Sequence, residues 1–183
     1  MSRLVSIFSC CIVSLILAKF VSPVVAVAQV SSDGSLSTTV TRNNLDFTIT
    51  NGSRGGNNLF HSFKEFSIPK GGSVYFNNST DVVNIINRVT GGKISDIDGL
   101  IRANGNANLF LINPSGIVFG EAAKLDIGGS FLASTADSLL FKDDVVFSAV
   151  DTSQKPLLSI NVPLGLQFGS TPGSFVNRST VTG

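Results

Sequence analysis

The amino-acid sequence predicts an all-β fold wound as a β-solenoid, and three observations lead to this class. Gly, Asn, Ser and Thr make up 65 of the 155 residues from 29 to 183, which leaves little room for long helices. The apolar runs are short, rich in β-branched and aromatic residues, and bounded by turn-forming residues, as strands are. Between residues 108 and 135 these runs also recur at a regular interval.

The chain begins with the features of a cleaved secretory signal peptide. Arg3 supplies a positive start, residues 4–18 are free of charge and mostly apolar, and Ala26-Val27-Ala28 offers a cleavage site. The charge-free run of 15 residues is shorter than the roughly 20 that span a bilayer. We therefore expect a signal peptide over residues 1–28, with a retained membrane anchor as the alternative.

Removal of this segment changes the composition of the mature chain. Cys10 and Cys11 leave with it, so the mature fold is expected to rely on burial and backbone pairing rather than on disulfides. Arg3 and Lys19 also leave, so 11 of the 13 basic residues remain against 12 acidic ones. These charges are scattered and form no basic stripe, which excludes nucleic acid as the expected partner.

The apolar runs of the mature chain mark the expected strands. In chain order they are 45–50 (LDFTIT), 73–76 (SVYF), 82–89 (VVNIINRV), 93–101 (KISDIDGLI), 108–113 (NLFLIN), 116–119 (GIVF) and 124–127 (KLDI). Gly, Asn or Asp bounds each of them, which is typical of strands. Residues 130–141 (SFLASTADSLLF) have ambiguous apolar spacing and are the best helix candidate in the chain.

The solenoid prediction comes from the spacing of four apolar residues. Leu109, Ile117, Leu125 and Leu132 follow one another at intervals of 8, 8 and 7, and each begins a strand-length run. Three short strands in a lap of about 23 residues have the dimensions of one coil of a solenoid. Pro114 and Gly116 fall between two such runs. Pro has a fixed φ and no amide proton, and Gly permits a positive φ, so both residues suit a corner rather than a strand.

An antiparallel β-sandwich is the alternative, because its strands also recur at about eight residues. The asparagines favour the solenoid, since side chains of this kind at corners stack into hydrogen-bonded ladders between coils. The residues considered are Asn77, Asn84, Asn87, Asn104, Asn108 and Asn113.

Several blocks of the sequence are similar to one known family. Residues 87–135, and especially the bend Asn113-Pro114-Ser115-Gly116-Ile117, resemble the amino-terminal secretion domain of filamentous haemagglutinins, the exoproteins of two-partner secretion in Gram-negative bacteria. Residues 56–78 and 162–173 resemble the segments that precede and end this block. The bend matches the family signature Asn-Pro-Asn-Gly-Ile with Ser in the third position, and a second family motif, Asn-Pro-Asn-Leu, does not occur.

The resemblance implies both a fold and a role. The fold is a right-handed parallel β-helix, a pectin-lyase-like β-solenoid with an N-terminal cap. The role is that of a secretion domain over residues 29–183, with little or no passenger. A dedicated outer-membrane β-barrel transporter with periplasmic domains would bind this domain and pass the chain to the cell surface. Asn113, Pro114, Ser115, Gly116 and Ile117 are the expected partner-recognition element, although they also suit a purely structural corner.

Two other functions remain open at this point, and both keep the β-helix. A β-helical carbohydrate-active enzyme of the polysaccharide lyase kind would use paired carboxylates, for which Asp96 and Asp98 beside Arg102 are the candidates. A stand-alone surface adhesin would bind glycans or proteins of a host or surface, as a longer passenger would.

Other chemistry finds little support in the residues present. His61 is the single histidine and no cysteine remains after signal removal, so a zinc site has no ligand set and His61 is expected in packing or at the surface. Ser115 lies outside a Gly-x-Ser-x-Gly context and no histidine follows it, which excludes a hydrolase triad. No phosphate-binding loop or dinucleotide fingerprint occurs, so we expect no cofactor and no enzymatic activity.

Overall fold

The computed structural model of the protein describes residues 29–142, 144–152 and 158–180. Within these ranges the chain forms 17 strands and no helix, in agreement with the predicted all-β class. The described residues include no helical segment of the length and apolar character needed to cross a bilayer. The predicted signal peptide, residues 1–28, lies outside the described residues.

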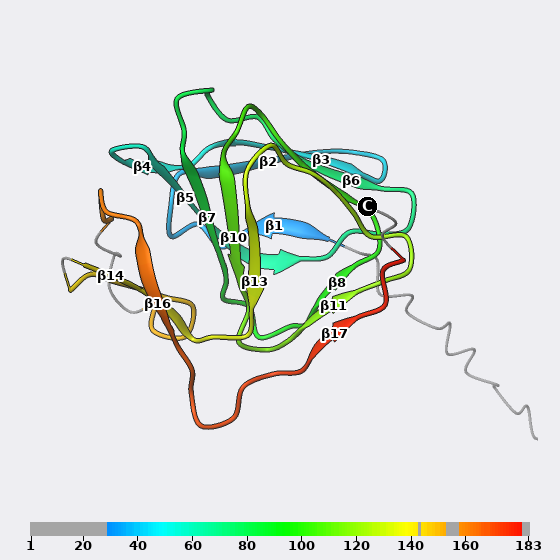
Figure 1. The fold of residues 1–183 in the computed structure, drawn as a ribbon. Coiled ribbons are helices and arrows are strands. Elements are labelled where there is room, and N and C mark those ends of the chain that lie inside the picture. The colour runs from blue at the N-terminus through cyan, green and yellow to red at the C-terminus, as the bar shows by residue number, and fades with distance from the viewer. Residues whose placement is uncertain (1–28, 143, 153–157, 181–183) are drawn as a thin grey trace, which may run out of the picture.

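Eleven of the strands wind into a right-handed parallel β-helix with three sheets (Figure 1). The first sheet contains β5 (Asn58–Phe66), β7 (Asn84–Val89), β10 (Asn108–Ile112) and β13 (Phe131–Ser134). The second contains β3 (Asp46–Asn51), β6 (Ser73–Phe76), β9 (Leu100–Ala103) and β12 (Lys124–Asp126). The third contains β8 (Ser95–Ile97), β11 (Ile117–Phe119) and β17 (Phe175–Asn177). Strand neighbours within each sheet come from successive coils and run parallel.

The strand register sets the length of a coil. Asp46 pairs with Ser73 and Leu109 with Phe131, so a lap takes between 22 and 27 residues, close to the predicted 23, except for the lap from Ile117 to Phe175, which contains the outer sheet. The four residues that predicted the repeat lie in β10, β11, β12 and β13. The antiparallel sandwich is therefore wrong for this part of the chain.

Antiparallel strands close the N-terminal end of the solenoid. β1 (Val30–Ser32) pairs with β5, β2 (Thr38–Asn43) pairs with β3, and β4 (Ser53–Gly55) pairs with the start of β5. These strands occupy the outer edges of β5 and β3, so the parallel stack ends there, and Val30 and Val40 pack on its core. The N-terminal cap is thus confirmed.

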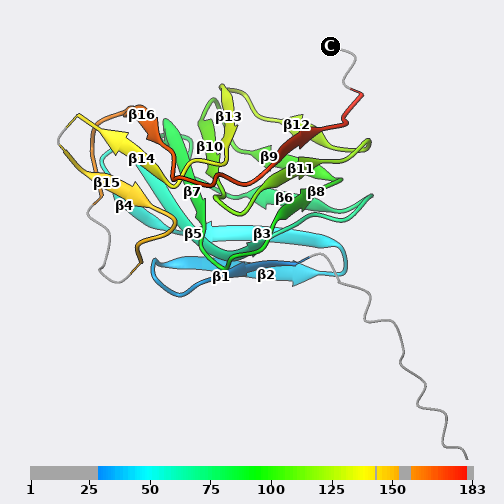
Figure 2. The same cartoon turned by 90° about the horizontal axis from the view of Figure 1, so that it is seen from below.

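A small antiparallel sheet lies outside the solenoid, beside its first sheet (Figure 2). It contains β14 (Ser138–Phe141), β15 (Val146–Ser148) and β16 (Pro163–Gln167), in the order β15-β14-β16. Residues 135–174 leave the solenoid to build this outer sheet, and the chain returns to the third sheet as β17. The sequence did not predict this excursion.

Two expectations about individual segments are wrong. The helix candidate 130–141 forms two strands, β13 and β14, because its apolar residues alternate: the partly buried Phe131 and Ala133 pack against one core, and Leu139 and Phe141 are buried in the other. The run 93–101 is not one strand but β8 followed by β9, with the chain turning from the third sheet to the second between them.

The alternation of side chains across the first sheet creates two cores. Leu59, Phe63, Ile85 and Leu109 point into the solenoid, where they pack with the apolar residues of the other two sheets. Phe60, Ile86 and Ile112 point outward and pack against Leu139, Phe141 and Phe147 of the outer sheet. The first sheet is therefore buried on both faces, which explains why β5 and β7 are almost continuously buried.

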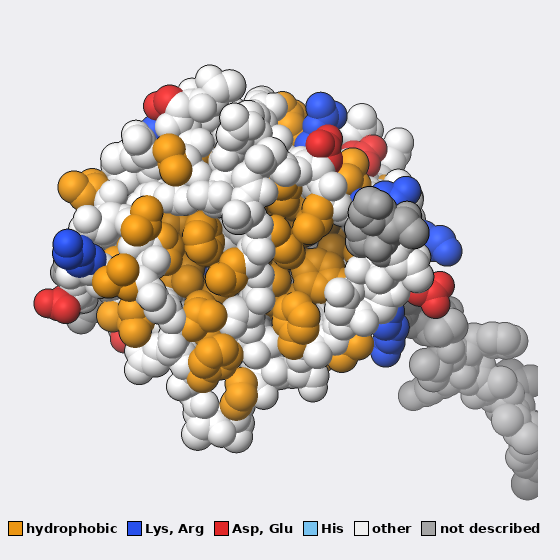
Figure 3. Space-filling model, in the orientation of Figure 1, with side chains coloured by type: hydrophobic (Ala, Val, Ile, Leu, Met, Phe, Trp, Pro, Cys, Tyr) orange, Lys and Arg blue, Asp and Glu red, His pale blue; other side chains and the backbone are white. Residues whose placement is uncertain are grey.

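The far end of the solenoid is less enclosed. β12, β13 and β17 each have one strand neighbour within the described residues, so one edge of each is unpaired. Hydrophobic side chains are visible on both sides of β13 on this face (Figure 3), and Leu125 and Phe175 are each 49% exposed. The unpaired backbone N–H and C=O groups at these edges can still pair with another strand.

Asparagine side chains link successive coils, as predicted. Asn84 Nδ2 donates to Asn58 Oδ1 at 2.8 Å, and Asn108 Nδ2 donates to Asn84 Oδ1 at 2.9 Å. At the N-terminal end Asn58 Nδ2 donates to the Ser159 and Asn161 carbonyls, and at the other end Asn108 Oδ1 accepts from the Ser130 amide. The ladder is therefore satisfied at both ends, and Asn58 is a member that sequence analysis did not single out.

Replacing Asn84 by Ala should destabilise the fold by about 2 kcal/mol, because one buried and one partly buried hydrogen bond are lost and the side-chain amides of Asn58 and Asn108 lose a partner. Urea unfolding followed by circular dichroism measures the change. Asn43→Ala is the control, since Asn43 is an exposed residue of β2 and its removal should cost less than about 0.5 kcal/mol. Equal unfolding free energies for the two variants would contradict the ladder's contribution.

Candidate functional site: the corner at Asn113–Ile117

The predicted recognition element forms the bend between β10 and β11, where the chain passes from the first sheet to the third. The Gly116 amide donates to the Asn113 carbonyl at 3.1 Å, which closes a turn with Pro114 and Ser115 at its centre. Gly116 has φ 127°, a conformation that favours glycine over any residue with a Cβ. The prediction of a corner at Pro114 is confirmed.

Asn113 is the internal support of this corner. Its side chain is fully buried, and Nδ2 donates to the Lys93 carbonyl and to Ser95 Oγ, each at 2.9 Å. Its Oδ1 accepts the Ser115 amide at 3.0 Å, as in an Asx-turn. The one side chain therefore shapes its own turn and ties it to the preceding coil.

The backbone of the corner is bonded on two sides. The Asn113 amide donates to the Ser134 carbonyl, and the Gly116 carbonyl accepts the Ser95 amide. On the other side, residues that return from the outer sheet complete the set: the Gly173 amide donates to the Pro114 carbonyl, and the Ile117 amide donates to the Ser174 carbonyl, both at 2.9 Å. The folded corner thus depends on a segment about 60 residues later in the chain.

Burial separates the five predicted residues into two groups. Asn113, Gly116 and Ile117 are buried, whereas Pro114 and Ser115 are half-buried. The structure brings all five residues together at one bend. Of these five, only the side chains of Pro114 and Ser115 are accessible to a partner in the folded domain. Gly173, which sequence analysis missed, lies so close that a Cβ there would be 2.4 Å from the Ser115 carbonyl carbon.

The carboxylates considered for lyase chemistry lie elsewhere, on the outside of the third sheet. Asp96 and Asp98 line a shallow polar cleft together with Glu121, Lys70 and Arg178. Asp98 Oδ1 accepts the Ala122 amide at 2.8 Å and so supports a turn.

Arg102 does not line this cleft. It pairs with Asp126 at 3.2 Å and stands over the Tyr75 ring on the second sheet. The expected grouping of Asp96 and Asp98 with Arg102 is therefore not formed. Across the described ranges, no group of three or more His, Cys, Asp and Glu residues is arranged to hold a metal ion.

His61 is packed in the solenoid core and is 1% exposed. Its Nδ1 lies 3.2 Å from Thr38 Oγ1, and its ring packs beside those of Phe63 and Phe76. Burial lowers the pKa of His61 to about 4, because the charged ring would lose its hydration there. His61 is therefore neutral at pH 7 and acts as a packing residue.

The most connected polar cluster lies between the first sheet and the outer sheet, around the fully buried guanidinium of Arg88. Arg88 donates to Ser62 Oγ, to Ser35 Oγ and to the Ser148 carbonyl, and it lies 4.7 Å from the centre of the Phe147 ring. Burial lowers the pKa of Arg88, and the nearby carboxylate of Asp33 opposes that change. No sequence signal identified this cluster.

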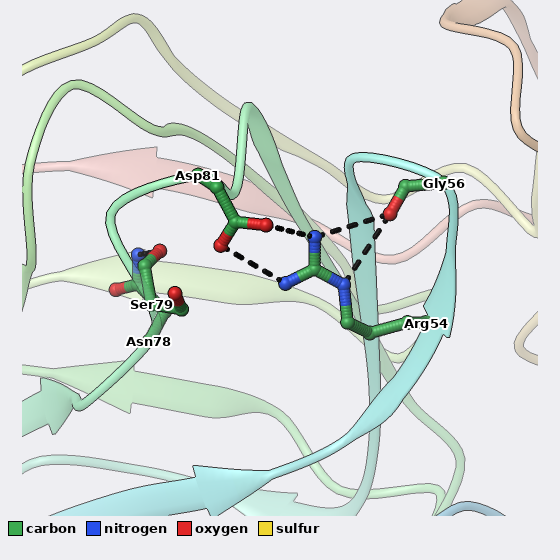
Figure 4. Close-up of polar contacts among 5 residues, drawn as sticks. All are labelled: Arg54, Gly56, Asn78, Ser79 and Asp81. Carbon is green, nitrogen blue, oxygen red and sulfur yellow. Dashed lines mark hydrogen bonds and ion pairs between the residues drawn. The ribbon is translucent and has the colours of Figure 1, made fainter.

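An exposed ion pair joins β4 of the N-terminal cap to the loop between β6 and β7 (Figure 4). Arg54 Nη2 lies 2.9 Å from Asp81 Oδ2, and the same guanidinium donates to the Gly56 carbonyl. A hydrogen bond from Ser79 and then hydrogen bonding from Arg54, with a smaller effect of the Arg54 charge, hold the pKa of Asp81 below its usual value. Both side chains of the pair are well exposed, so water screens this contact.

Comparison with known proteins places the chain in a family. The model of the TPS secretion domain matches residues 28–181, nearly the whole of the mature chain. Two heme/hemopexin-binding proteins of Haemophilus influenzae are 35% and 37% identical over 75 and 73 residues, which cover 41% and 40% of this chain. The matched stretches span only 8% and 7% of those relatives.

A solved structure is also similar, the HMW1 secretion domain of Haemophilus influenzae. It has 31% sequence identity and a TM-score of 0.45, over 60% of this chain and 27% of that one. The family-model match extends through all three solenoid sheets, the corner and the outer sheet. The chain therefore belongs to the TPS secretion domain family, the secretion domains of two-partner secretion exoproteins.

Proposed function

We propose that residues 1–28 direct the chain across the inner membrane and are removed, and that residues 29–183 then act as the export signal for the outer membrane. The periplasmic domains of a dedicated outer-membrane β-barrel transporter bind this domain, and the chain folds at the cell surface. The Asn113–Ile117 corner is the element that the transporter recognises. Membership of the secretion-domain family is the observation that carries this proposal.

Two physical features of the chain support this route. Without Cys10 and Cys11 the mature chain has no cysteine, so no disulfide can trap it in the oxidising periplasm before it is threaded. Stacking each coil on the previous one buries apolar side chains at roughly 25 cal/mol per Å², which opposes backward movement through a narrow barrel. Folding outside the cell would thereby favour export.

The test compares Pro114→Ala with the unchanged chain in capture by the purified periplasmic domains of the cognate transporter. The Pro114 side chain is half-buried and its carbonyl bond to Gly173 survives the change, so stability should fall by less than about 1 kcal/mol. If the corner is recognised, capture should fall by about tenfold, the equivalent of about 1.4 kcal/mol of contact. Secretion into the medium by cells that express the transporter should fall in parallel.

Asn113→Ala tests the same corner and needs a matched control, because the loss of its buried hydrogen bonds also destabilises the fold. Asn84→Ala is that control, since it removes hydrogen bonds between side-chain amides of the asparagine ladder and leaves the corner intact. Unchanged capture and export of both corner variants would show that the corner serves the fold only.

A further inference from the structure

The outer sheet covers the outward face of three successive coils at once. Phe60 of β5, Ile86 of β7 and Ile112 of β10 are fully buried on this face. They share one apolar core with Leu139 of β14 and Phe147 of β15, and the rings of Phe60 and Phe147 meet edge to face with 5.1 Å between their centres. In an ordinary solenoid each repeat contacts its neighbours alone. The outer sheet therefore adds contacts that join coils one, two and three through a single element.

The first sheet is the sheet that requires such a cover. Its strands β5 and β7 are almost continuously buried, on both faces. In the other two sheets the outward positions carry polar, exposed side chains instead, such as Asp96 in β8 and Arg102 in β9. Without the outer sheet, β5, β7 and β10 would expose an apolar face to water, which opposes folding of these coils. Their burial is thus supplied by a segment that comes later in the chain.

Polar contacts repeat this dependence. Arg88 in β7 donates to the carbonyl of Ser148 in β15, 60 residues further along the chain. Asn58, the first residue of β5, donates through Nδ2 to two carbonyls of residues 159–161, at separations of 101 and 103 residues. The N-terminal coils therefore obtain both apolar cover and hydrogen-bond acceptors from the same distant part of the chain.

This arrangement changes how the solenoid can fold. A solenoid held only by neighbouring coils can begin anywhere and grow one coil at a time. Here the coils that contain β5, β7 and β10 gain their outward contacts only after segments 60 to 101 residues apart have met. Closing loops of this length costs chain entropy before the contacts are gained. The three coils and the outer sheet are thus expected to form together.

We propose that the outer sheet controls folding of the domain: while β14 and β15 are held away from the first sheet, the coils of β5, β7 and β10 stay unfolded. This inference rests on the proposed function and specifies how the chain is kept unfolded before it reaches the cell surface. A transporter that holds this one segment extended keeps three coils open. Once the segment is released outside, it docks on the first sheet and the coils form with it.

Amide hydrogen exchange of the mature chain tests the coupling. Phe147→Leu keeps an apolar side chain at the centre of the second core but loses part of the contact with Phe60, so the variant should fold with lower stability. If the outer sheet and the coils open together, amides of β5 and β7 should exchange about tenfold faster, by the same factor as amides of β14. Mass spectrometry of peptides from the exchanged chain measures the three strands separately.

Val146→Ala is the matched control. Val146 is the neighbour of Phe147 in β15, but it lies on the opposite face of the strand and is 46% exposed. Its replacement should leave exchange in β5 and β7 unchanged. If Phe147→Leu accelerates exchange in β14, β15 and β16 alone, the outer sheet opens independently of the coils and the inference is overturned.

Phe147→Asp withholds the outer sheet permanently, because its carboxylate would have to be buried beside the Phe60 ring. Each chain is diluted from urea and tested for capture by the transporter's periplasmic domains, at once and after incubation. The unchanged chain and Val146→Asp should fold and lose capture at least about tenfold, whereas Phe147→Asp should keep its initial capture. Loss of capture by Phe147→Asp on the time course of the other two, or no loss by any of them, would contradict the inference.

The two experiments separate this inference from the proposed function. If none of the chains is captured even directly after dilution, the proposed function fails. The exchange measurement involves no transporter, so it still decides whether the outer sheet controls folding of the coils.

Discussion

Replacing Arg88 by Ala should lower the free energy of unfolding by about 3–5 kcal/mol, the largest single effect expected in this domain. The guanidinium is buried between the first sheet and the outer sheet, and it donates hydrogen bonds to two hydroxyl oxygens and one carbonyl oxygen from three parts of the chain. Ala would leave the Ser62 and Ser35 hydroxyls and the Ser148 carbonyl without this donor. It would also leave a cavity beside the Phe147 ring.

The effect should be distributed over the fold because of what Arg88 connects. Ser35 belongs to the N-terminal cap, Ser62 to β5, and Ser148 to β15 of the outer sheet. Asp33, which accepts from Ser62 and Thr90, also loses its nearby positive charge. We therefore expect loss of the outer sheet and the cap together, in one transition shifted to lower denaturant.

Urea unfolding of the mature chain, followed by far-ultraviolet circular dichroism, measures this change. Arg42→Ala is the matched control, because Arg42 also stands over an aromatic ring, that of Phe47, but is exposed and bonds one carbonyl. Its removal should cost less than about 1 kcal/mol. A similar loss for the two variants would mean that the buried cluster contributes nothing beyond an ordinary surface arginine.

The parts of the fold that sequence reasoning predicted are those with a local repeat. Leu109, Ile117, Leu125 and Leu132 predicted the coil because each coil repeats the same burial pattern at nearly the same spacing. The Asn113-Pro114-Ser115-Gly116 corner was predictable for a similar reason, because the residues that form its turn are consecutive in the sequence.

The parts that were missed depend on contacts between distant residues. The outer sheet is held by Phe60 and Ile86 of the first sheet, and nothing in residues 138–167 indicates which face they cover. In the sequence, nothing distinguishes Arg88 from an exposed strand residue. Its role depends on Ser35 and Ser148, which are distant in sequence and lie beside it only in the fold. Gly173 likewise acquires its role only through the approach of Pro114 and Ser115. Such contacts have no spacing signal, because the segments are separated by excursions of variable length.

Acidification should destabilise the domain between pH 6.5 and pH 4 through its one histidine. Burial holds the pKa of His61 at about 4 in the folded chain, against 6.5 for an exposed imidazole. In this interval the unfolded chain binds a proton that the folded chain does not, so stability falls as the pH falls. The difference between the two pKa values corresponds to about 3 kcal/mol, present in full above pH 6.5 and lost once the pH is below about 4.

The contribution of Asp33 lies below this window, which separates it from the effect of His61. The pKa of Asp33 is below its ordinary value of 3.8, because hydrogen bonds from Ser62, Ser35 and Thr90 outweigh the opposing effect of burial. The stability that Asp33 contributes is present above that ordinary value and is lost as the pH falls further, through its folded-state pKa. A decline that begins near pH 6.5 therefore belongs to His61.

Urea unfolding at a series of pH values between 4 and 7 tests this assignment with His61→Phe as the partner variant. Phe keeps an aromatic ring beside Phe63 and Phe76 and gives up only the contact with Thr38, so the variant should remain folded. Its unfolding free energy should be nearly flat across the interval, whereas that of the unchanged chain should decline by about 3 kcal/mol. The same slope in both proteins would instead show that the ring of His61 stays accessible to protons in the folded domain.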